Sequence, residues 1–167
     1  MSFEERDKDH DKVLERVRYL LNSKGYKVCK SGVKEWLSKT LRNEIIAITK
    51  TECNFLATVL RFWPDLTAAR NKKECHLFEV KWPDSIEQNA FEAYKILQLM
   101  MKVKYGHMPS KSEVYIVFAM RLQEYCRLVH IDDLALKKPW MQTNNSKSSG
   151  DTYAYVNWEK TKYTILC

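Results

Sequence analysis

One strand–helix–strand segment in the second half of the chain constrains the fold more than any other feature. Residues 75–82 predict a strand, which Pro83-Asp84-Ser85 ends. The same three residues begin a long helix over about 86–105. Residues 113–120 are almost all apolar, which is typical of a strand buried on both faces. Because a strand, a helix and a strand in this order form a right-handed unit with parallel strands, we expect an α/β fold.

Local patterns predict the remaining elements with differing clarity. Apolar residues at helical spacing indicate a helix over 9–22 and another over 33–44, whereas 45–63 fits neither helix nor strand. A short helix over 123–130 and a loop over 142–151 are expected nearer the C-terminus. Further strands are predicted over 26–30, 66–69 and 153–165 (the last as an edge strand or hairpin), with a turn at Asn71-Lys72-Lys73.

Positive charge is concentrated in one segment. The 167 residues carry a formal net charge of +7, and residues 23–50 hold seven basic groups against two acidic ones. Such a segment attracts a polyanion, with an affinity that falls steeply as salt rises. A solvated lysine-rich surface is the alternative interpretation. The candidate nucleic-acid-binding residues are Lys24, Lys27, Lys30, Lys34, Lys39 and Arg42.

What the sequence lacks excludes or disfavours several classes of protein. The four glycines are scattered singly, so no glycine-rich loop for a nucleotide is present. No run of about 18 apolar residues exists, and the first residues lack the apolar stretch of a secretory signal. The five cysteines are odd in number and widely spaced, which predicts small buried side chains rather than disulfides or a zinc site. We expect a protein of the reducing cytoplasm with no membrane contact.

The strand over 75–82 carries a charged pair. Side chains alternate between the faces of a strand, so Glu79 and Lys81 point to the same side of a strand that is expected to be central. A carboxylate and an ammonium are costly to bury unless they are paired or bind a charged group. If this motif is considered alone, the alternative to a buried site is a Glu–Lys pair on a solvent-exposed face of the strand.

A second carboxylate precedes this strand. Asp65 follows Pro64 and lies 14 residues before Glu79. A tight turn at 71–73 would pair the two strands antiparallel and bring Asp65 beside Glu79 and Lys81. Two carboxylates near a lysine form a hard-oxygen site of the kind that Mg²⁺ or Mn²⁺ prefers. Such an ion polarises a phosphodiester, while the lysine orients the attacking water or offsets developing charge.

These residues resemble the PD-(D/E)xK nuclease superfamily. Pro64-Asp65 is followed by Glu79-Val80-Lys81 at the end of a strand, then by a helix and a buried strand. The first helix, followed by Gly25-Tyr26-Lys27-Val28, is similar in arrangement to the archaeal Holliday-junction resolvases of that superfamily. The resemblance covers about residues 10–120 and implies a restriction-endonuclease-like core, a central mixed sheet flanked by helices. It also implies metal-dependent hydrolysis of nucleic acid, with Asp65 and Glu79 as metal ligands and Lys81 as the catalytic lysine.

The first helix departs from the resolvase pattern, which usually places an inward-facing acid there. The only acid in the middle of that helix, Glu15, lies far from its apolar stripe, whereas His10 lies close to it. Some members of the superfamily use a histidine at this position, so His10 is the candidate third metal ligand; a histidine at the rim of the core is the alternative. Glu44 is a rival ligand. Glu87 and Gln88 are candidates to support the site.

The resemblance implies one nuclease domain over 1–167. Within it, 33–60 is expected to be a basic insertion that grips the substrate, and 151–167 a C-terminal strand or hairpin. We predict an endonuclease that uses Mg²⁺ or Mn²⁺ on nucleic acid, DNA rather than RNA, including branched or recombination intermediates. A resolvase would act as a symmetric homodimer because it cuts two strands at once. Two alternatives stay open: a catalytically inactive nucleic-acid-binding protein of the same fold, and a protein-interaction module with a basic face.

Overall fold

The computed structural model describes residues 3–51, 54–71, 73–82, 84–102, 111–119, 125–142 and 151–167, with side chains from residue 9 onward except at 50 and 51. The helices are α1 (Phe3–Ser23), α2 (Val33–Trp36), α3 (Lys39–Thr51), α4 (Phe55–Arg61), α5 (Gln88–Met101) and a 3₁₀ turn, η1 (Ile131–Asp133). The strands are β1 (Lys27–Lys30), β2 (Leu66–Arg70), β3 (Glu74–Lys81), β4 (Ser85–Glu87), β5 (Val114–Ala119), β6 (Cys126–His130), β7 (Leu136–Met141), β8 (Tyr153–Val156) and β9 (Thr164–Leu166).

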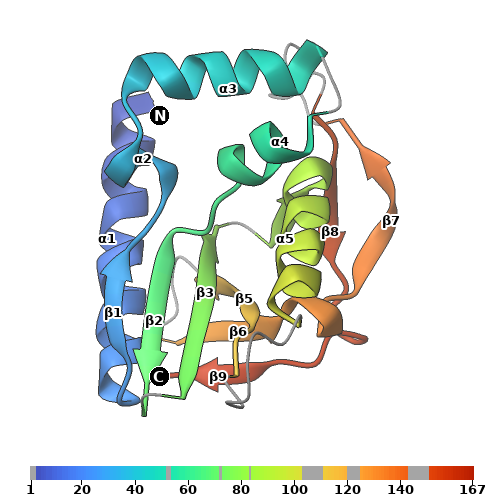
Figure 1. The fold of residues 1–167 in the computed structure, drawn as a ribbon. Coiled ribbons are helices and arrows are strands. Elements are labelled where there is room, and N and C mark those ends of the chain that lie inside the picture. Colours follow the sequence, from blue (N-terminus) through green and yellow to red (C-terminus); the bar gives the residue numbers. More distant parts are fainter. Residues whose placement is uncertain are drawn as a thin grey trace.

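The main sheet is mixed and has six strands in the order β1-β2-β3-β5-β6-β9 (Figure 1). Strands β3 and β5, on either side of α5 in the sequence, pair in parallel as predicted, with Glu79 opposite Ile116. The other neighbouring pairs in this sheet are antiparallel. Strand β3 is therefore an inner strand, and the prediction of an α/β fold with a mixed sheet is confirmed.

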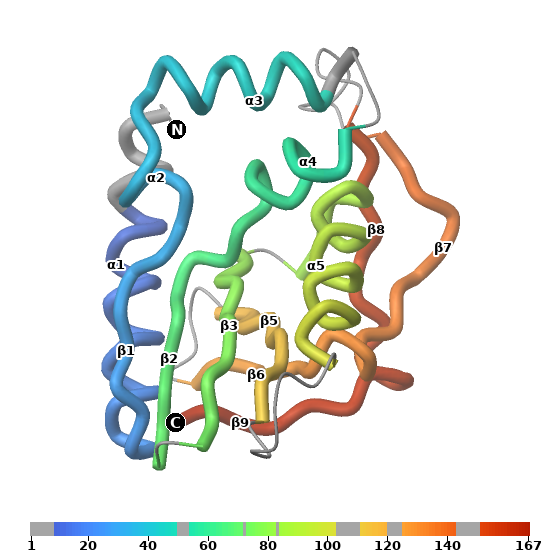
Figure 2. The backbone as a smooth tube through the Cα atoms, in the orientation of Figure 1, coloured from blue at the N-terminus to red at the C-terminus, as the bar shows by residue number. Residues whose placement is uncertain are grey.

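Side-chain alternation along the inner strands creates a core on each face of this sheet. On β3, Leu77 belongs to the core beneath α5, whereas its neighbours Phe78 and Val80 belong to the core beneath α1. The two helices lie on opposite sides of the sheet (Figure 2). Because both faces are covered, β5 is apolar along almost its whole length, and a charged residue on the inner strand β3 lies between two cores.

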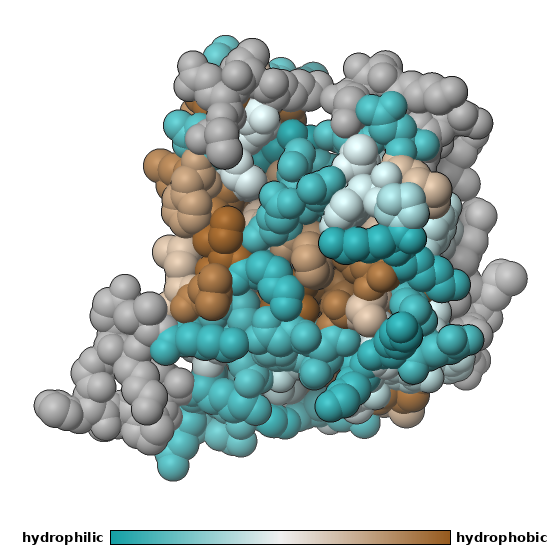
Figure 3. Space-filling model, turned by 90° about the vertical axis from the view of Figure 1, so that its right-hand side faces the viewer, coloured by the Kyte–Doolittle hydropathy of each residue, from teal (hydrophilic) through white to brown (hydrophobic). Residues whose placement is uncertain are grey.

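A second sheet and three helices extend this layered core. Strands β4, β8 and β7 form a three-stranded antiparallel sheet beside α5. Helix α3 lies across the end of the molecule that also contains α2 and α4 (Figure 1). Seen from the side of α5 and β7, the surface has an apolar area among hydrophilic side chains (Figure 3). No helix of the described residues combines the length and apolar character needed to cross a membrane.

Several predicted elements differ from the structure because pairing between distant segments outweighs local pattern. The predicted helix over 123–130 is wrong where it is described, because Cys126–His130 pairs with β5 as strand β6. The predicted helix over 33–44 is interrupted at Leu37, which is extended, and Ser38 accepts a hydrogen bond from the Leu41 N–H to begin α3.

The C-terminal half contains further differences. Ile86 was expected in the long helix but lies in β4, paired with Ala154 of β8. Residues 153–165 form no hairpin: β8 belongs to the small sheet and β9 to the edge of the large one. Strand β7 was not predicted. Most of the loop predicted over 142–151 lies outside the described residues.

The cysteines correct a further prediction. Four of them are described, all free, and only Cys126 is buried; Cys29, Cys75 and Cys167 are exposed. Cys75 is exposed and its neighbour His76 is buried, as expected for adjacent residues on opposite faces of a strand.

Candidate functional site

The turn between β2 and β3 determines where the first carboxylate lies. Asn71 adopts the left-handed conformation (φ 55°), and the strands on either side pair antiparallel, with Leu66 opposite Phe78. Asp65 directly precedes Leu66, so it lies beside Glu79. Its Oδ2 atom accepts a hydrogen bond of 3.0 Å from the Val80 N–H. The predicted approach of Asp65 to the Glu79–Lys81 end of β3 is confirmed.

Glu79 lies at the centre of the site. Its side chain is only 8% exposed, and its Oε1 atom is 2.5 Å from the Lys81 Nζ atom. The hydroxyl of Tyr94, on the buried face of α5, forms a hydrogen bond with the same carboxyl group. The Asp65 and Glu79 carboxyl groups are also close enough to share a hydrogen bond, in which protonated Glu79 donates. Two acids therefore meet with one lysine at a position where Glu79 is buried and Asp65 and Lys81 are partly exposed.

This proximity changes how the groups ionise. Burial, followed by repulsion from Asp65, raises the pKa of Glu79 to about 7. Burial also raises the pKa of Asp65, although Lys81 and the Val80 N–H act against it. Burial alone would lower the pKa of Lys81, but attraction by Glu79 and Asp65 outweighs it and raises this pKa. Near neutral pH the Glu79 carboxyl group is therefore only partly ionised, next to a second acid and a positively charged lysine.

His10 reaches the same site from α1. Its Nε2 atom is 3.8 Å from Asp65 Oδ2. Burial lowers the pKa of this imidazole, although the negative charge of Glu79 acts against it. At pH 7 the ring is therefore neutral, and one nitrogen has a lone pair available for a metal or a proton. The structure brings His10 together with Asp65, Glu79 and Lys81.

A cavity of about 220 Å³ connects these groups with solvent. It is lined by all four of these side chains and by Tyr94. Further walls come from α2, from the end of α4 and from the segment that leads into β2, through Lys34, Arg61, Phe62 and Trp63 among others. Acids, a base, a lysine and aromatic rings thus open onto one space that a small group can enter.

Other candidate residues lie elsewhere. Glu44 is exposed on α3 and does not line this cavity. Glu87 ends β4, and its Oε1 atom is 3.5 Å from Arg61 Nη2. It borders the site, where its negative charge helps to raise the pKa of Lys81. Gln88 forms hydrogen bonds with Glu92 and Thr152, which directs its side chain away from the acids.

The six candidate nucleic-acid-binding residues lie in three places. Lys34, Lys39 and Arg42 lie on or beside the short helices near the site. Lys30 forms an ion pair of 2.9 Å with Glu15 on α1. Lys24 and Lys27 are exposed near the other end of β1, where Lys27 lies opposite Ala69. They are therefore about the length of a strand away from Asp65.

Sequence reasoning assigned Tyr94 to the core and did not connect it with the acids. Tyr94 is fully buried, and burial together with Glu79 and Asp65 raises the pKa of its hydroxyl. A tyrosine on an otherwise apolar helical stripe is a usable signal, because a buried hydroxyl needs a polar partner. Arg61 and Trp63 gave no such signal, since 45–63 had no clear periodicity.

The donors suit a hard divalent cation. Mg²⁺ is commonly held by one or two carboxylates and otherwise keeps its water ligands, and Asp65 and Glu79 supply two adjacent carboxylates. No three His, Cys, Asp or Glu side chains in the described ranges already form a metal-binding group. A cation here would take the place of the proton that the two acids share, with His10 as the nearest additional donor. Comparisons of the chain with protein-family models, with curated proteins and with solved structures found no match.

Proposed function

We propose that the protein is a metal-dependent nuclease of the PD-(D/E)xK type, with a restriction-endonuclease-like core, that hydrolyses phosphodiester bonds in nucleic acid. One observation carries this proposal: Asp65, Glu79, Lys81 and His10 line a single cavity at the end of two paired inner strands. In a non-catalytic protein, two adjacent acids with raised pKa values only lower stability near neutral pH.

Each residue has a distinct role in this proposal. Asp65 and Glu79 would hold Mg²⁺ or Mn²⁺, and the ion would supply the Lewis acidity for activating water and the phosphate. Lys81, 2.5 Å from Glu79, would orient the attacking water or offset the developing negative charge. His10, uncharged near pH 7, is the third ligand or accepts a proton from water. Tyr94 holds the Glu79 carboxyl group from behind.

The surroundings of the site suit a polyanion. Lys34 and Arg61 line the cavity, and Lys39 and Arg42 lie on the neighbouring helix α3. Cations beside the cavity would bind the phosphates on either side of the cleaved bond, which gives an affinity that falls as salt rises. DNA is the substrate that we propose first, with branched DNA and a symmetric dimer as the form that a resolvase would need.

The test is cleavage of plasmid, linear, single-stranded and branched DNA, each with and without Mg²⁺ or Mn²⁺. The wild type is expected to cleave at least one of these only when metal is present. Glu79→Gln is expected to lose at least about 100-fold in rate, while Glu44→Gln, which removes an exposed acid outside the cavity, keeps wild-type activity. Equal cleavage by the wild type and Glu79→Gln would attribute the activity to a contaminant and overturn the proposal.

The same assay separates the two alternatives. Binding that weakens with salt, without metal-dependent cleavage of any substrate, is the result expected of a non-catalytic protein of this fold. Absence of DNA binding at low salt would favour a protein-interaction module instead. Light scattering tests the resolvase form: a strict monomer contradicts it, because two symmetric cuts need two sites.

A further inference from the structure

A second and larger cavity adjoins the catalytic one. It has a volume of about 490 Å³ and lies between α2, α3 and α4. Most of its wall is apolar and comes from Val33, Leu37, Ile45, Ile46 and Leu60. An apolar cavity of this size at the surface is typical of a site for a ligand with flat, apolar faces.

The charged part of the wall has one sign. Lys34, Lys39, Arg42 and Arg61 line the cavity, and no acid is among the described residues of its lining. Arg61 already pairs with Glu87 and Asp151. In contrast, the Nε atom of Arg42 is buried without a hydrogen-bond partner among the described residues. The apolar wall and its cationic side chains together suit a molecule that combines an apolar face with negative charge.

The two cavities are adjacent. Val33, Lys34 and Arg61 line both of them, so a chain with its scissile phosphate at Asp65 and Glu79 would place an adjoining unit between α2 and α3. The adjoining unit of a nucleic acid is a nucleotide, which has an apolar base and an anionic phosphate. Charge and shape therefore agree on the same occupant.

We propose that this second cavity receives an unpaired nucleobase next to the scissile phosphate, so that the substrate is single-stranded or locally unpaired nucleic acid. The proposal rests on the proposed nuclease function. A base inside a duplex is stacked on both faces and cannot enter a cavity, whereas a base in a single strand or at a branch is free to do so. Lys39 and Arg42 then hold the phosphates on either side of that base.

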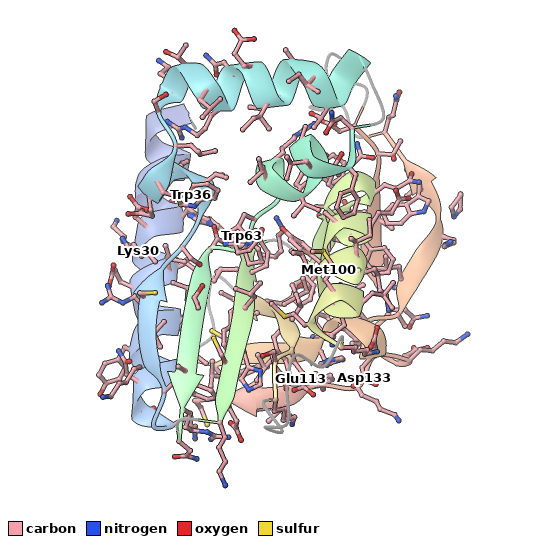
Figure 4. All side chains as sticks on the ribbon, in the orientation of Figure 1. Lys30, Trp36, Trp63, Met100, Glu113 and Asp133 are labelled. Carbon is pink, nitrogen blue, oxygen red and sulfur yellow. The ribbon has the colours of Figure 1, made fainter. Side chains whose placement is uncertain are left out.

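Two tryptophans offer a place for a neighbouring base. Trp36 is 50% exposed on α2, and its ring lies edge-on to that of Trp63, with the ring centres 6.5 Å apart. Figure 4 shows Trp36 and Trp63 at the end of the sheet where α2 lies. Trp63 lines the catalytic cavity and Trp36 contacts the Trp63 ring, so a base that leaves the cavity would meet the exposed ring of Trp36. Stacking on exposed aromatic rings is the usual way in which single strands are held without sequence preference.

The test compares two neighbouring isoleucines on α3. Ile46 lines the cavity and Ile48 does not, although they are 37% and 38% exposed. Ile46→Asp and Ile48→Asp add the same charge to the same helix, but only the first puts a carboxylate into the cavity wall. Binding is measured without metal, by fluorescence anisotropy of a labelled single-stranded oligonucleotide and of the same strand in a blunt duplex. Thermal melting verifies that both variants fold. If Ile46→Asp does not fold, Leu37→Glu, which puts a carboxylate into another part of the cavity wall, replaces it.

The wild type is expected to bind the single strand more tightly than the duplex. Ile46→Asp should weaken single-strand binding by about tenfold more than Ile48→Asp does, which is the effect of losing one bound base. Equal weakening by both variants, or tighter binding of the duplex by the wild type, overturns the inference. Cleavage separates the two proposals. If Ile46→Asp cleaves as the wild type does, the nuclease proposal is kept and the proposed base-binding cavity is rejected. If the wild type binds as expected but cleaves no substrate with either metal, the nuclease proposal is rejected.

Discussion

The two ends of the main sheet contain similar residue types in different surroundings. At one end, acids, a lysine and a histidine line the cavity of about 220 Å³. At the other, a cavity of about 410 Å³ is lined by Lys111, Glu113 and His130, with Tyr115 and Asp133 among their neighbours. Figure 4 shows Glu113 and Asp133 at this second end and Trp63 at the first.

Burial and the spacing of like charges separate the two ends. Burial alone would raise the pKa of Glu113, but the hydrogen bond from the Tyr115 hydroxyl and the charge of Lys111 outweigh burial and lower this pKa. Glu74, nearby, has a lowered pKa because Arg70 donates to it. Each of these acids is matched by a donor or a cation, whereas Asp65 and Glu79 share one lysine and have raised pKa values. The comparison teaches that a cluster of charges is a candidate site only when its charges are buried and unbalanced.

The largest expected difference between the two ends is in catalysis. Lys81→Met is expected to reduce the rate of metal-dependent cleavage by about 100-fold or more, because the charge beside the attacking water is lost. Lys111→Met removes a lysine that is 3.4 Å from Glu113 and should leave the rate unchanged. Single-turnover cleavage under saturating metal measures both. A comparable loss in the two variants would contradict the assignment of function to one end.

Histidine replacement should have a smaller effect. His10→Asn is expected to raise the Mn²⁺ concentration needed for half-maximal cleavage by about tenfold, because a donor beside Asp65 is weakened. His130→Asn, at the other end, is the matched control, and its metal dependence should equal that of the wild type. An unchanged metal dependence in His10→Asn would assign this histidine to the rim of the core.

The pH dependence of stability should differ in sign between the two ends. The folded-state pKa of Glu79, about 7, exceeds its ordinary value of 4.5, so this group's contribution to stability is complete below pH 4.5 and is lost as pH rises through 7. Without metal, the free energy of unfolding is expected to fall by on the order of 1–3 kcal/mol between pH 5 and 8 relative to Glu79→Gln. Asp65, Lys81, His10 and Tyr94 face this carboxyl group and stay unchanged in the comparison.

Glu113→Gln provides the opposite case. Because the pKa of Glu113 is lowered, its contribution is present above its ordinary pKa and is lost as pH falls. Urea unfolding in EDTA at several pH values measures both variants. Parallel pH profiles for the wild type and Glu79→Gln would show that the two acids are not coupled.

The smallest effect concerns salt. Lys39→Gln, beside the site, is expected to reduce the slope of log affinity against log salt by about one, because one phosphate contact is lost. Lys27→Gln, near the other end of β1, should leave the slope unchanged although it removes the same charge. Equal slopes for the two variants would mean that the polyanion does not follow the helices α2 and α3.

The sequence predicted the parts of the fold that depend on short-range pattern. The pattern over 75–82 identified β3, the apolar run over 113–120 identified β5, and the turn at 71–73 identified the pairing that brings Asp65 to Glu79. Helical periodicity placed His10 on the inner side of α1, where it now lies 3.8 Å from Asp65. These features could be predicted because each depends on the residue pattern of one continuous segment.

Features that depend on distant partners could not be predicted. Strands β6 and β7 carry polar and basic residues, and only their pairing with β5 and β8 makes them strands. Tyr94 was predicted to belong to a buried stripe of the helix, but its hydrogen bond with Glu79 depends on how α5 packs against β3. The second cavity depends on the angle between α2 and α3, which follows from the interruption at Leu37 and Ser38.

The most direct test of the account is calorimetric titration of Mn²⁺ into the wild type and into Asp65→Asn, in buffers of differing ionisation enthalpy. We predict one saturable site in the wild type and its loss in Asp65→Asn. Binding should release close to one proton at pH 6 and progressively less as pH rises past 7, because the cation displaces the proton held by a carboxyl group with a pKa of about 7. The same binding and proton release in Asp65→Asn would contradict the account.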